Sequence, residues 1–307
     1  MKQRYYSFSS YLRERFGERV HRISINAGFS CPNLDGTKDS GGCIFCNNKA
    51  FSYFANLEGF SLEEQIAAGI EYGRRRFKAK KFILYFQSFS NTYGDINFLK
   101  EKYSCIKKFD NIVGLAVSTR PDCIDEEKLN VIERFKEDYE VYVEYGLGSV
   151  HNKTLGLINR NHKFADFQKA VALTQEYGIN TGAHLILGLP GETASDMFAT
   201  MRILSKMPLW GVKFHCLHVV KDTHLEQMYR NNEIKLLSED EYVNILVRAL
   251  ELIPKNWVIL RLVSDADRNL LVAPFWLNDK HRILKKIEEE FNKRKSYQGL
   301  RYESTCN

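Results

Sequence analysis

The stretch RISINAGFSCPNLDGTKDSGGCIFC, residues 22–46, decides the fold. Residues 22–26 alternate polar and apolar side chains as a strand does, and a polar loop rich in Gly, Asp and Asn follows. The loop carries three cysteines in the spacing Cys31-x11-Cys43-x2-Cys46. Thiolates are the usual ligands of iron–sulfur clusters, and three of them leave one corner of a four-iron cluster open. This strand and loop therefore predict a reactive metal centre at the end of a strand.

Two other interpretations of these cysteines remain open. The first is a zinc site made by the three cysteines and a nearby histidine such as His21, although no second Cys-x2-Cys or His-x3-His motif is present. The second is a set of buried apolar cysteines, which a glycine-rich polar loop fits poorly. A second cluster is not expected, because the other cysteines form no paired motif: Cys105, Cys123, Cys216 and Cys306.

Beyond the loop, apolar β-rich segments alternate with segments of helical period. The expected strands are residues 22–26, 82–86, 112–117, 141–147, 183–187 and 212–219, and the expected helices between them are residues 62–77, 98–109, 125–136, 164–177 and 194–206. Such repetition is typical of a parallel sheet covered by helices. We predict an α/β fold: a partial (βα)6 TIM-like barrel over residues 21–222, preceded by a basic arm (1–20) and followed by an α/β extension packed on the barrel (223–307). The extension is expected to hold a helix near residues 239–252, a strand near 257–263 and a basic helix near 280–295.

Composition excludes several classes of protein. With 307 residues, 44% hydrophobic and 27% charged, the chain is an ordinary globular one. No apolar run reaches about 18 residues and no secretory leader is apparent, so we expect a cytoplasmic protein without membrane contact. The net charge of +6 is concentrated in residues 74–81 and 285–295, which favours RNA as a partner or, equally, solvated helix ends. The basic, aromatic arm suits RNA or a helix that covers one end of the barrel.

Each predicted strand ends in polar residues, and in parallel α/β folds such residues meet at one rim. Their order resembles that of radical S-adenosylmethionine (SAM) enzymes, in the branch that includes the elongator catalytic subunit and oxygen-independent coproporphyrinogen oxidase. The long first gap between the cysteines is also found in elongator-like members. The resemblance implies one 4Fe-4S cluster on Cys31, Cys43 and Cys46, SAM cleaved there to a 5′-deoxyadenosyl radical, and a reduced flavodoxin or ferredoxin-type electron donor.

The same resemblance implies SAM contacts for residues at the strand ends. These are Gln87, Ser88, Asn91, Ser118, Arg120, Glu144, Arg160, His184, Leu189 and Glu192. Arg160 matches the arginine that pairs with the SAM carboxylate, which a guanidinium fork suits. His184 takes the place of a ribose-binding carboxylate, and Ser118 that of a glutamate.

Candidate catalytic residues come from the last predicted strand and its loop: Lys213, His215, Cys216 and His218, with Lys221 beside them. Cations and imidazoles there would bind a carboxylate or phosphate of the substrate, and Cys216 would serve as a thiol donor. A packed strand with alternating polar residues is the other interpretation. Arg261, Asp265 and Arg268 are candidates for a rim above the pocket.

More narrowly, the segments at 31–37, 91–93, 189–193 and 273–276 resemble short bacterial radical SAM proteins of the YhcC/YtqA type. That resemblance implies tRNA as the substrate, with the wobble-uridine 5-substituent trimmed from carboxymethylaminomethyl to aminomethyl before a separate tRNA methyltransferase acts. One alternative is a radical SAM enzyme for a peptide or small molecule. Another is a non-catalytic, zinc-stabilised RNA-binding protein.

Overall fold

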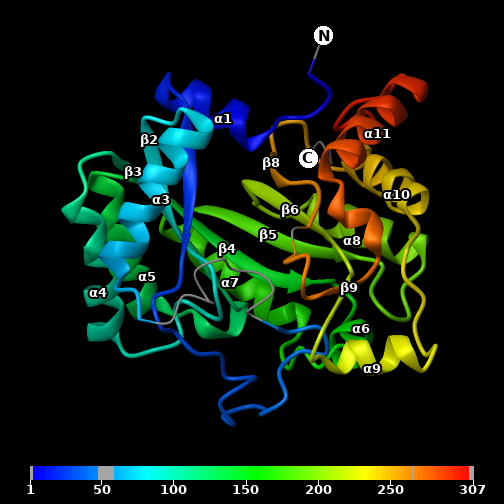
Figure 1. The fold of residues 1–307 in the computed structure, drawn as a ribbon, viewed down its shortest axis with the longest axis horizontal. Helices are drawn as coiled ribbons and strands as arrows, with labels where there is room; N and C mark the ends of the chain where they lie inside the picture. Colours follow the sequence, from blue (N-terminus) through cyan, green and yellow to red (C-terminus); the bar gives the residue numbers. More distant parts are fainter. Residues whose placement is uncertain (1–2, 48–58, 265, 304–307) are drawn as a thin grey trace.

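A seven-stranded parallel sheet forms the centre of the computed structural model, which describes residues 3–47, 59–264 and 266–303 (Figure 1). Its strands follow one another in chain order. They are β1 (Val20–Ile25), β2 (Lys81–Phe86), β3 (Ile112–Thr119), β4 (Glu140–Gly148), β5 (Asn180–Leu187), β6 (Gly211–Cys216) and β8 (Val258–Arg261). The predicted parallel α/β partial barrel is confirmed, and the extension contributes a seventh strand, β8, which pairs with β6.

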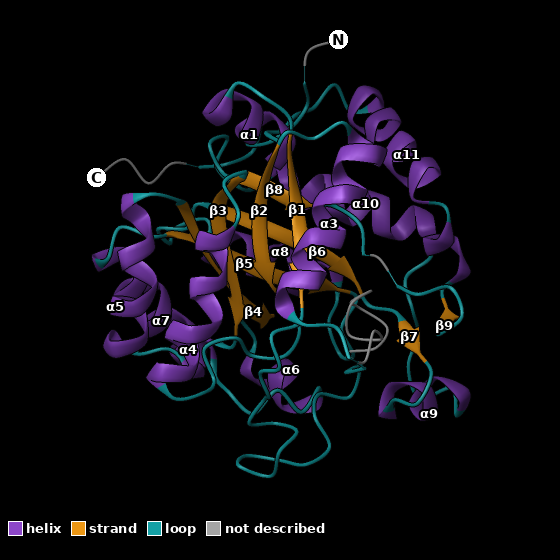
Figure 2. Cartoon of the chain, turned by 60° about the vertical axis from the view of Figure 1, so that its left-hand side comes forward, coloured by secondary structure: helices purple, strands orange, loops and turns teal. Residues whose placement is uncertain are grey.

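Helices cover the outside of the curved sheet (Figure 2). They are α3 (Leu62–Phe77), α4 (Ile96–Ser104), α5 (Glu126–Glu133), α7 (Phe164–Glu176), α8 (Ala194–Leu204) and α10 (Glu239–Glu251). Helix α11 (Lys280–Lys293) packs on α10, α6 (Asn152–Leu157) follows β4 at the carboxyl end of the sheet, and α9 (His224–Arg230) lies away from the sheet. The predicted bounds of α3 are confirmed, because Ser61 and Glu64 form a capping box at its start. Gly69 lets α3 lie directly on β1, since a Cβ there would meet Ile23 Cγ2 at 2.3 Å. Ile23 therefore faces the helices, and its strand neighbour Arg22 faces the barrel interior.

The N-terminal arm closes the amino end of the barrel. Helix α1 (Phe8–Phe16) buries Leu12 in a cluster with Ile83, Tyr85 and Tyr142, and Ser7 bridges to Ile259 of β8. Of the two expectations for the arm, the structure therefore shows the helix that covers one end of the barrel.

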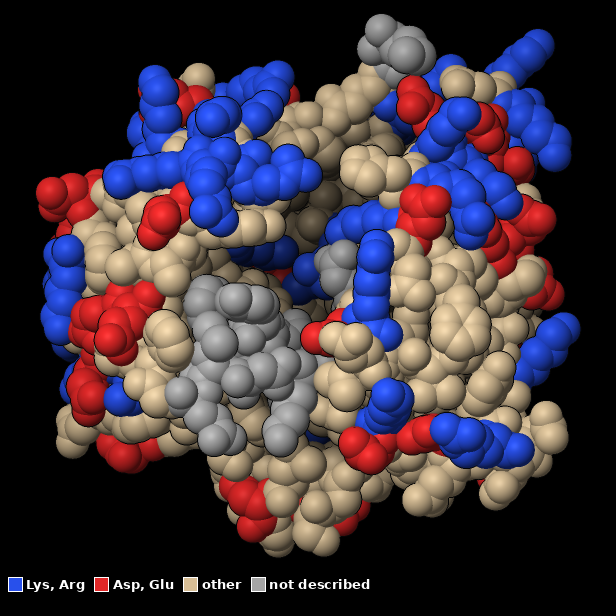
Figure 3. Space-filling view, viewed as in Figure 1, with Lys and Arg blue, Asp and Glu red and all other residues tan. Residues whose placement is uncertain are grey.

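The small strands β7 (Val219–Val220) and β9 (Leu271–Ala273) pair antiparallel beside the barrel. The face of the molecule that is turned to the viewer in Figure 3 is hollowed. The hollow lies between the side formed by α1 and α3 and the side formed by α10 and α11. Within the described ranges, no helix is long and apolar enough to cross a membrane.

Candidate radical SAM site

A cleft opens where the strands end, and it gathers most of the residues that the sequence singled out. Its lining includes all three predicted metal ligands, Cys31, Cys43 and Cys46. It also includes, from the predicted SAM and catalytic sets, Gln87, Ser88, Ser118, Arg120, Arg160, His184, Lys213, His215, Cys216 and His218. Arg261 of β8 lines it as well, whereas Asp265 lies outside the described residues and Arg268 donates to the Asn278 carbonyl instead.

Four predicted SAM contacts lie behind the lining. Asn91 is fully buried and donates from Nδ2 to the carbonyls of Ser88 and Ser118 at 2.9 and 2.8 Å, so it fixes the positions of two lining residues. Glu144 lies under the floor of the cleft, Leu189 packs in a small apolar cluster, and Glu192 accepts a hydrogen bond from Ser149. Contacts of these four side chains with SAM stay a prediction.

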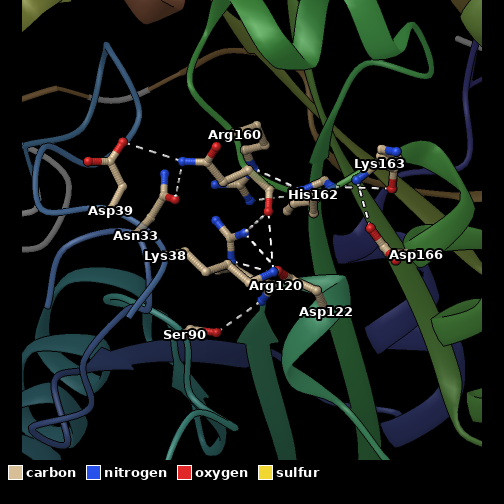
Figure 4. Close-up of polar contacts among 12 residues, drawn as sticks. Asn33, Lys38, Asp39, Ser90, Arg120, Asp122, Arg160, His162, Lys163 and Asp166 are labelled. Carbon is tan, nitrogen blue, oxygen red and sulfur yellow. Dashed lines mark hydrogen bonds and ion pairs between the residues drawn. The ribbon is translucent and has the colours of Figure 1, made fainter. Parts of the chain in front are cut away.

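The cysteine loop is fixed to the segment after α6 by amide side chains (Figure 4). Asn159 donates from Nδ2 to Asp39 at 2.5 Å and to the Gly42 carbonyl at 2.7 Å. Asn33 donates to the Asn159 carbonyl at 2.6 Å, and Asn161 donates to Asn33 Oδ1 at 2.8 Å. Asn159 and Asn161 both have positive φ, 52° and 54°, a conformation that asparagine tolerates better than most residues. The loop is therefore held in place by residues other than its cysteines.

A buried ion-pair cluster adds a second attachment. Arg120 binds Asp122 with Nε and Nη2 at 2.9 and 2.8 Å, and Lys38 of the cysteine loop pairs with the same carboxylate (Figure 4). Burial acts to raise the pKa of Asp122, but the hydrogen bonds and charge of Arg120 lower it to about 2. The carboxylate thus stays ionised and ties the loop to the end of β3.

Arg160 lies against the cysteines. Its Nη1 is 3.3 Å from Cys43 Sγ, its Nη2 donates to the Gly146 carbonyl, and its Nε donates to His162 Nε2 at 3.1 Å. Burial and the charge of Arg160 lower the pKa of His162 to about 3, so this imidazole stays neutral and accepts. The guanidinium is therefore oriented by its neighbours toward the cysteine end of the cleft.

The thiols suit a cluster better than a single ion. Burial and then the nearby Cys43 and Cys31 raise the pKa of Cys46 to about 12, so the three sulfurs lie close enough to affect one another. His21, the histidine considered for a zinc site, stacks on Phe77 with ring centroids 4.5 Å apart and does not line the cleft. The donors at this end of the cleft are therefore three thiols, the usual ligands of a 4Fe-4S cluster, in which they bind different irons. These residues fit the cluster that the resemblance implies.

The floor of the cleft is a charged network inside the barrel. Glu144 of β4 accepts from Arg22 at 2.5 Å, from His184 at 2.6 Å and from Tyr85 at 2.8 Å, with Lys213 Nζ at 3.4 Å. Lys213 also donates to the Tyr85 hydroxyl at 2.7 Å, and Arg22 stacks 4.2 Å over the Tyr85 ring. Five strands thus contribute one residue each to a single layer.

Burial sets the charges of this network. It opposes ionisation of Glu144, but Arg22 and Lys213 hold the pKa of this carboxyl well below its usual range. Burial and the charge of Lys213 lower the pKa of His184 to about 4, and the same two causes lower that of His215. The carboxylate is therefore ionised and both imidazoles are neutral at pH 7.

The lining is cationic. Among the described residues no Asp or Glu lines the cleft, while Arg120, Arg160, Lys213 and Arg261 do. Arg120 Nη1 and Ser88 Oγ are buried and have no hydrogen-bond partner among the residues that the structure describes. Because buried polar atoms are nearly always paired, these two atoms indicate a ligand.

Sequence reasoning missed the Tyr85 hydroxyl and the asparagine attachments of the loop. Tyr85 reads as a core aromatic in an apolar strand, and nothing in the pattern distinguishes it. Asn159 and Asn161 did carry a signal, since two asparagines flanking an arginine suggest left-handed backbone.

Comparison with known proteins decides the family. The model of the radical SAM superfamily matches residues 40–204, and that of the radical SAM C-terminal domain matches residues 209–293. The chain belongs to the radical SAM superfamily. The uncharacterised protein YtqA of Bacillus subtilis is 34% identical over 97% of this radical SAM chain and 92% of its own length. Protein YhcC of Escherichia coli K12 is 33% identical over 93% and 91%. The predicted family is confirmed, and the non-catalytic zinc alternative loses its basis.

More distant relatives share part of this radical SAM chain or its fold. The tRNA uridine(34) acetyltransferase of Methanocaldococcus infernus is 29% identical over 52% of this chain and 30% of its own length. The solved structure of Methanocaldococcus infernus Elp3 has a TM-score of 0.65 at 20% identity, covering 88% of this chain and 63% of that one. Methylornithine synthase (PylB) has a TM-score of 0.53 at 14% identity, covering 94% and 86%. Both structures confirm the partial barrel.

Proposed function

We propose that this radical SAM chain acts on the 5-substituent of the tRNA wobble uridine, converting carboxymethylaminomethyl to aminomethyl. The observation that carries the proposal is the cleft itself, in which three thiols share one lining with three arginines and a lysine and with no described carboxylate. Such a cleft suits two anionic groups, the carboxylate of SAM and the carboxylate of the substituent. Similarity to a protein named tRNA uridine(34) acetyltransferase supports RNA as the substrate class.

Cys31, Cys43 and Cys46 would hold the 4Fe-4S cluster. When bound, the cluster supplies the electron that cleaves SAM to a 5′-deoxyadenosyl radical. Arg120 and Arg160 lie on the cysteine side of the cleft and would bind the SAM carboxylate. Arg120 is the better placed of the two, because its Nη1 has no protein partner.

On the substrate side, β6 and β8 present Lys213, His215 and Arg261 to the cleft. Lys213 already donates to Tyr85, and burial lowers its pKa well below the usual range although Glu144 opposes that shift, whereas the neutral His215 imidazole can donate or accept. Burial raises the pKa of Cys216, which therefore stays a thiol. His218 donates from Nδ1 to the Cys216 carbonyl, 2.8 Å away.

Nucleoside mass spectrometry of tRNA from cells lacking the protein tests the substrate. Carboxymethylaminomethyl-uridine should accumulate and aminomethyl-uridine, with the methylated product of a downstream tRNA methyltransferase, should disappear. Complementation with the wild-type gene should restore the profile, and complementation with Cys46→Ala should not. An unchanged profile in the deletion strain would remove tRNA as the substrate and leave a peptide or small molecule.

A further inference from the structure

Cations gather around the end of α3. Arg74, Arg75 and Arg76 form its last turn, and Lys78 is its C-cap. Arg19 joins them, because its Nη1 donates to the Phe77 carbonyl at 2.7 Å. All five side chains are exposed, and we call them the α3 patch. Figure 3 shows Lys and Arg side chains massed over α1 and the adjoining part of α3, next to the hollow of this face.

The α3 patch has no acidic partner. Its neighbours Lys80 and Lys108 pair with Glu18 and Glu63 at 3.0 and 2.6 Å. Across the described part of the chain, no ion pair within 4.0 Å involves a patch residue, and even Glu71, one turn earlier on α3, does not reach one. The negative end of the α3 dipole stabilises the cations of the patch. This stabilisation offsets only part of the repulsion between them.

The second basic segment of the chain behaves differently. On α11, Lys285 pairs with Glu289 at 3.7 Å, Lys286 with Asp240 at 2.9 Å and Lys293 with Glu290 at 3.8 Å. The acidic partners neutralise these three lysines, so the positive electrostatic potential around them is small. The two segments look alike in sequence, and only the α3 patch retains its charge for a partner.

An exposed aromatic ring accompanies the patch. Tyr72 is 50% exposed on α3, and its ring lies 5.7 Å from that of Phe77. Arginines beside an exposed aromatic ring suit RNA, whose phosphates take the guanidinium forks and whose bases stack on rings. A membrane surface would require an apolar face beside the cations, and α3 buries its apolar side chains against the barrel.

We propose that the α3 patch binds the phosphate backbone of a structured RNA whose reacting nucleoside enters the cleft. The inference rests on the proposed function for the entry of the nucleoside, and on the unpaired cations for the binding surface. The patch lies at the C-terminal end of α3, beside the starts of β1 and β2, and therefore at the amino end of the barrel, while the cleft opens at the carboxyl ends of the strands. Helix α3 packs on β1, an edge strand of the sheet, and its 16 residues span about 24 Å, so an RNA that binds both places would have to follow this open edge from the patch to the cleft.

The test compares three full-length, anaerobically reconstituted proteins in mobility shifts with unfractionated tRNA. The patch variant carries Arg74→Gln, Arg75→Gln and Arg76→Gln, and the matched control carries Lys285→Gln, Lys286→Gln and Lys293→Gln. Both remove three cations from one helix and keep a good helix former, although Lys285 and Lys286 lie in the middle of α11 and only Lys293 lies in its last turn. The patch variant should bind roughly 10- to 100-fold more weakly, with a salt slope reduced by about 3, while the control binds like wild type.

Each result decides the proposal. Equal binding by the patch variant and wild type, or an equal loss in the control, would overturn the patch whatever the nucleoside profile shows. A patch variant that loses binding to phosphatidylglycerol vesicles but not to tRNA would also overturn it. Selective loss of tRNA binding upholds the patch even if the wobble-uridine profile of the deletion strain is unchanged, and then only the proposed substrate fails.

Discussion

The two ends of the cleft differ in whether their functional side chains also stabilise the fold. At one end the cysteine loop is held by Asn33, Asp39 and Asn159, and its thiols bear little of that attachment. At the other end Glu144 is saturated by four strands' side chains and holds the barrel interior together. The thiols can therefore be replaced with little effect on the stability of the fold. Replacing a residue of the charged floor should destabilise the barrel. Substitutions at the two ends should therefore separate chemistry from folding.

The largest effect is expected at the cysteine end. Replacing Cys31, Cys43 or Cys46 with Ala should abolish iron incorporation and reductive cleavage of SAM, because a 4Fe-4S cluster lacks a ligand. The unfolding free energy of the iron-free protein should change by about 1 kcal/mol or less, since other residues fix the loop. Iron content after anaerobic reconstitution, expected near four per wild-type chain, and denaturant unfolding measure the two effects.

The matched control is Cys105→Ala. Cys105 is 4% exposed in the main core and lies outside the cleft lining. This variant should bind iron like wild type and lose some stability through a small cavity. Iron-loaded, SAM-cleaving protein from any of the three loop variants would contradict the assignment of the cluster ligands.

At the floor of the cleft, Glu144→Ala should have a large effect on stability, whereas the cysteine variants should have a small one. It leaves Arg22 and Lys213 as buried cations without their carboxylate, a change that typically costs 3–5 kcal/mol. The apo protein should lose that much unfolding free energy in a denaturant titration, while its thiols remain titratable. Tyr85→Phe is the graded control, since it removes one hydroxyl from the same network and should cost about 1–2 kcal/mol. Glu144→Ala and wild type of equal stability would show that the two ends do not differ.

Some of these features could be predicted from the sequence and others could not. The six βα units were predictable because continuous apolar strands and capped helices such as Ser61–Phe77 are set by local pattern. The three cysteines were predictable because thiols in a polar loop have few other uses. The strand predicted near residues 257–263 is confirmed as β8, but its place as the seventh strand of the sheet was not predictable, because it joins the sheet through pairing with β6, a contact between distant parts of the chain.

Partners were harder to predict than positions. Glu144 and His184 stood out as polar residues inside apolar strands, but the hydrogen bonds of Glu144 with His184, Arg22 and Tyr85 depend on which faces of four strands meet across the barrel. The two basic segments make the same point on the surface. Whether a lysine or arginine is neutralised is decided by neighbouring elements such as α10, which supplies Asp240 to α11.

The smallest expected effect concerns pH at the floor. The pKa of His184 is lowered to about 4 in the fold, chiefly by burial, against about 6.5 in an unfolded chain. Between these values the unfolded state binds a proton that the folded state does not, so stability falls as pH falls. For His184 alone the loss between pH 7 and pH 5 is about 2 kcal/mol.

Denaturant unfolding of the apo protein at pH 7, 6 and 5 measures this loss. His162 and His215 have lowered pKa values too and act in the same direction, so the contribution of His184 is the difference between wild type and His184→Gln. The Gln side chain keeps a donor for Glu144 but takes up no proton, and its stability should fall less steeply with acid. The exposed His281→Gln should follow wild type. If the stability of His184→Gln instead falls as steeply as that of wild type, the fold does not lower the pKa of His184, and the imidazole takes up its proton over the same pH range as in the unfolded chain.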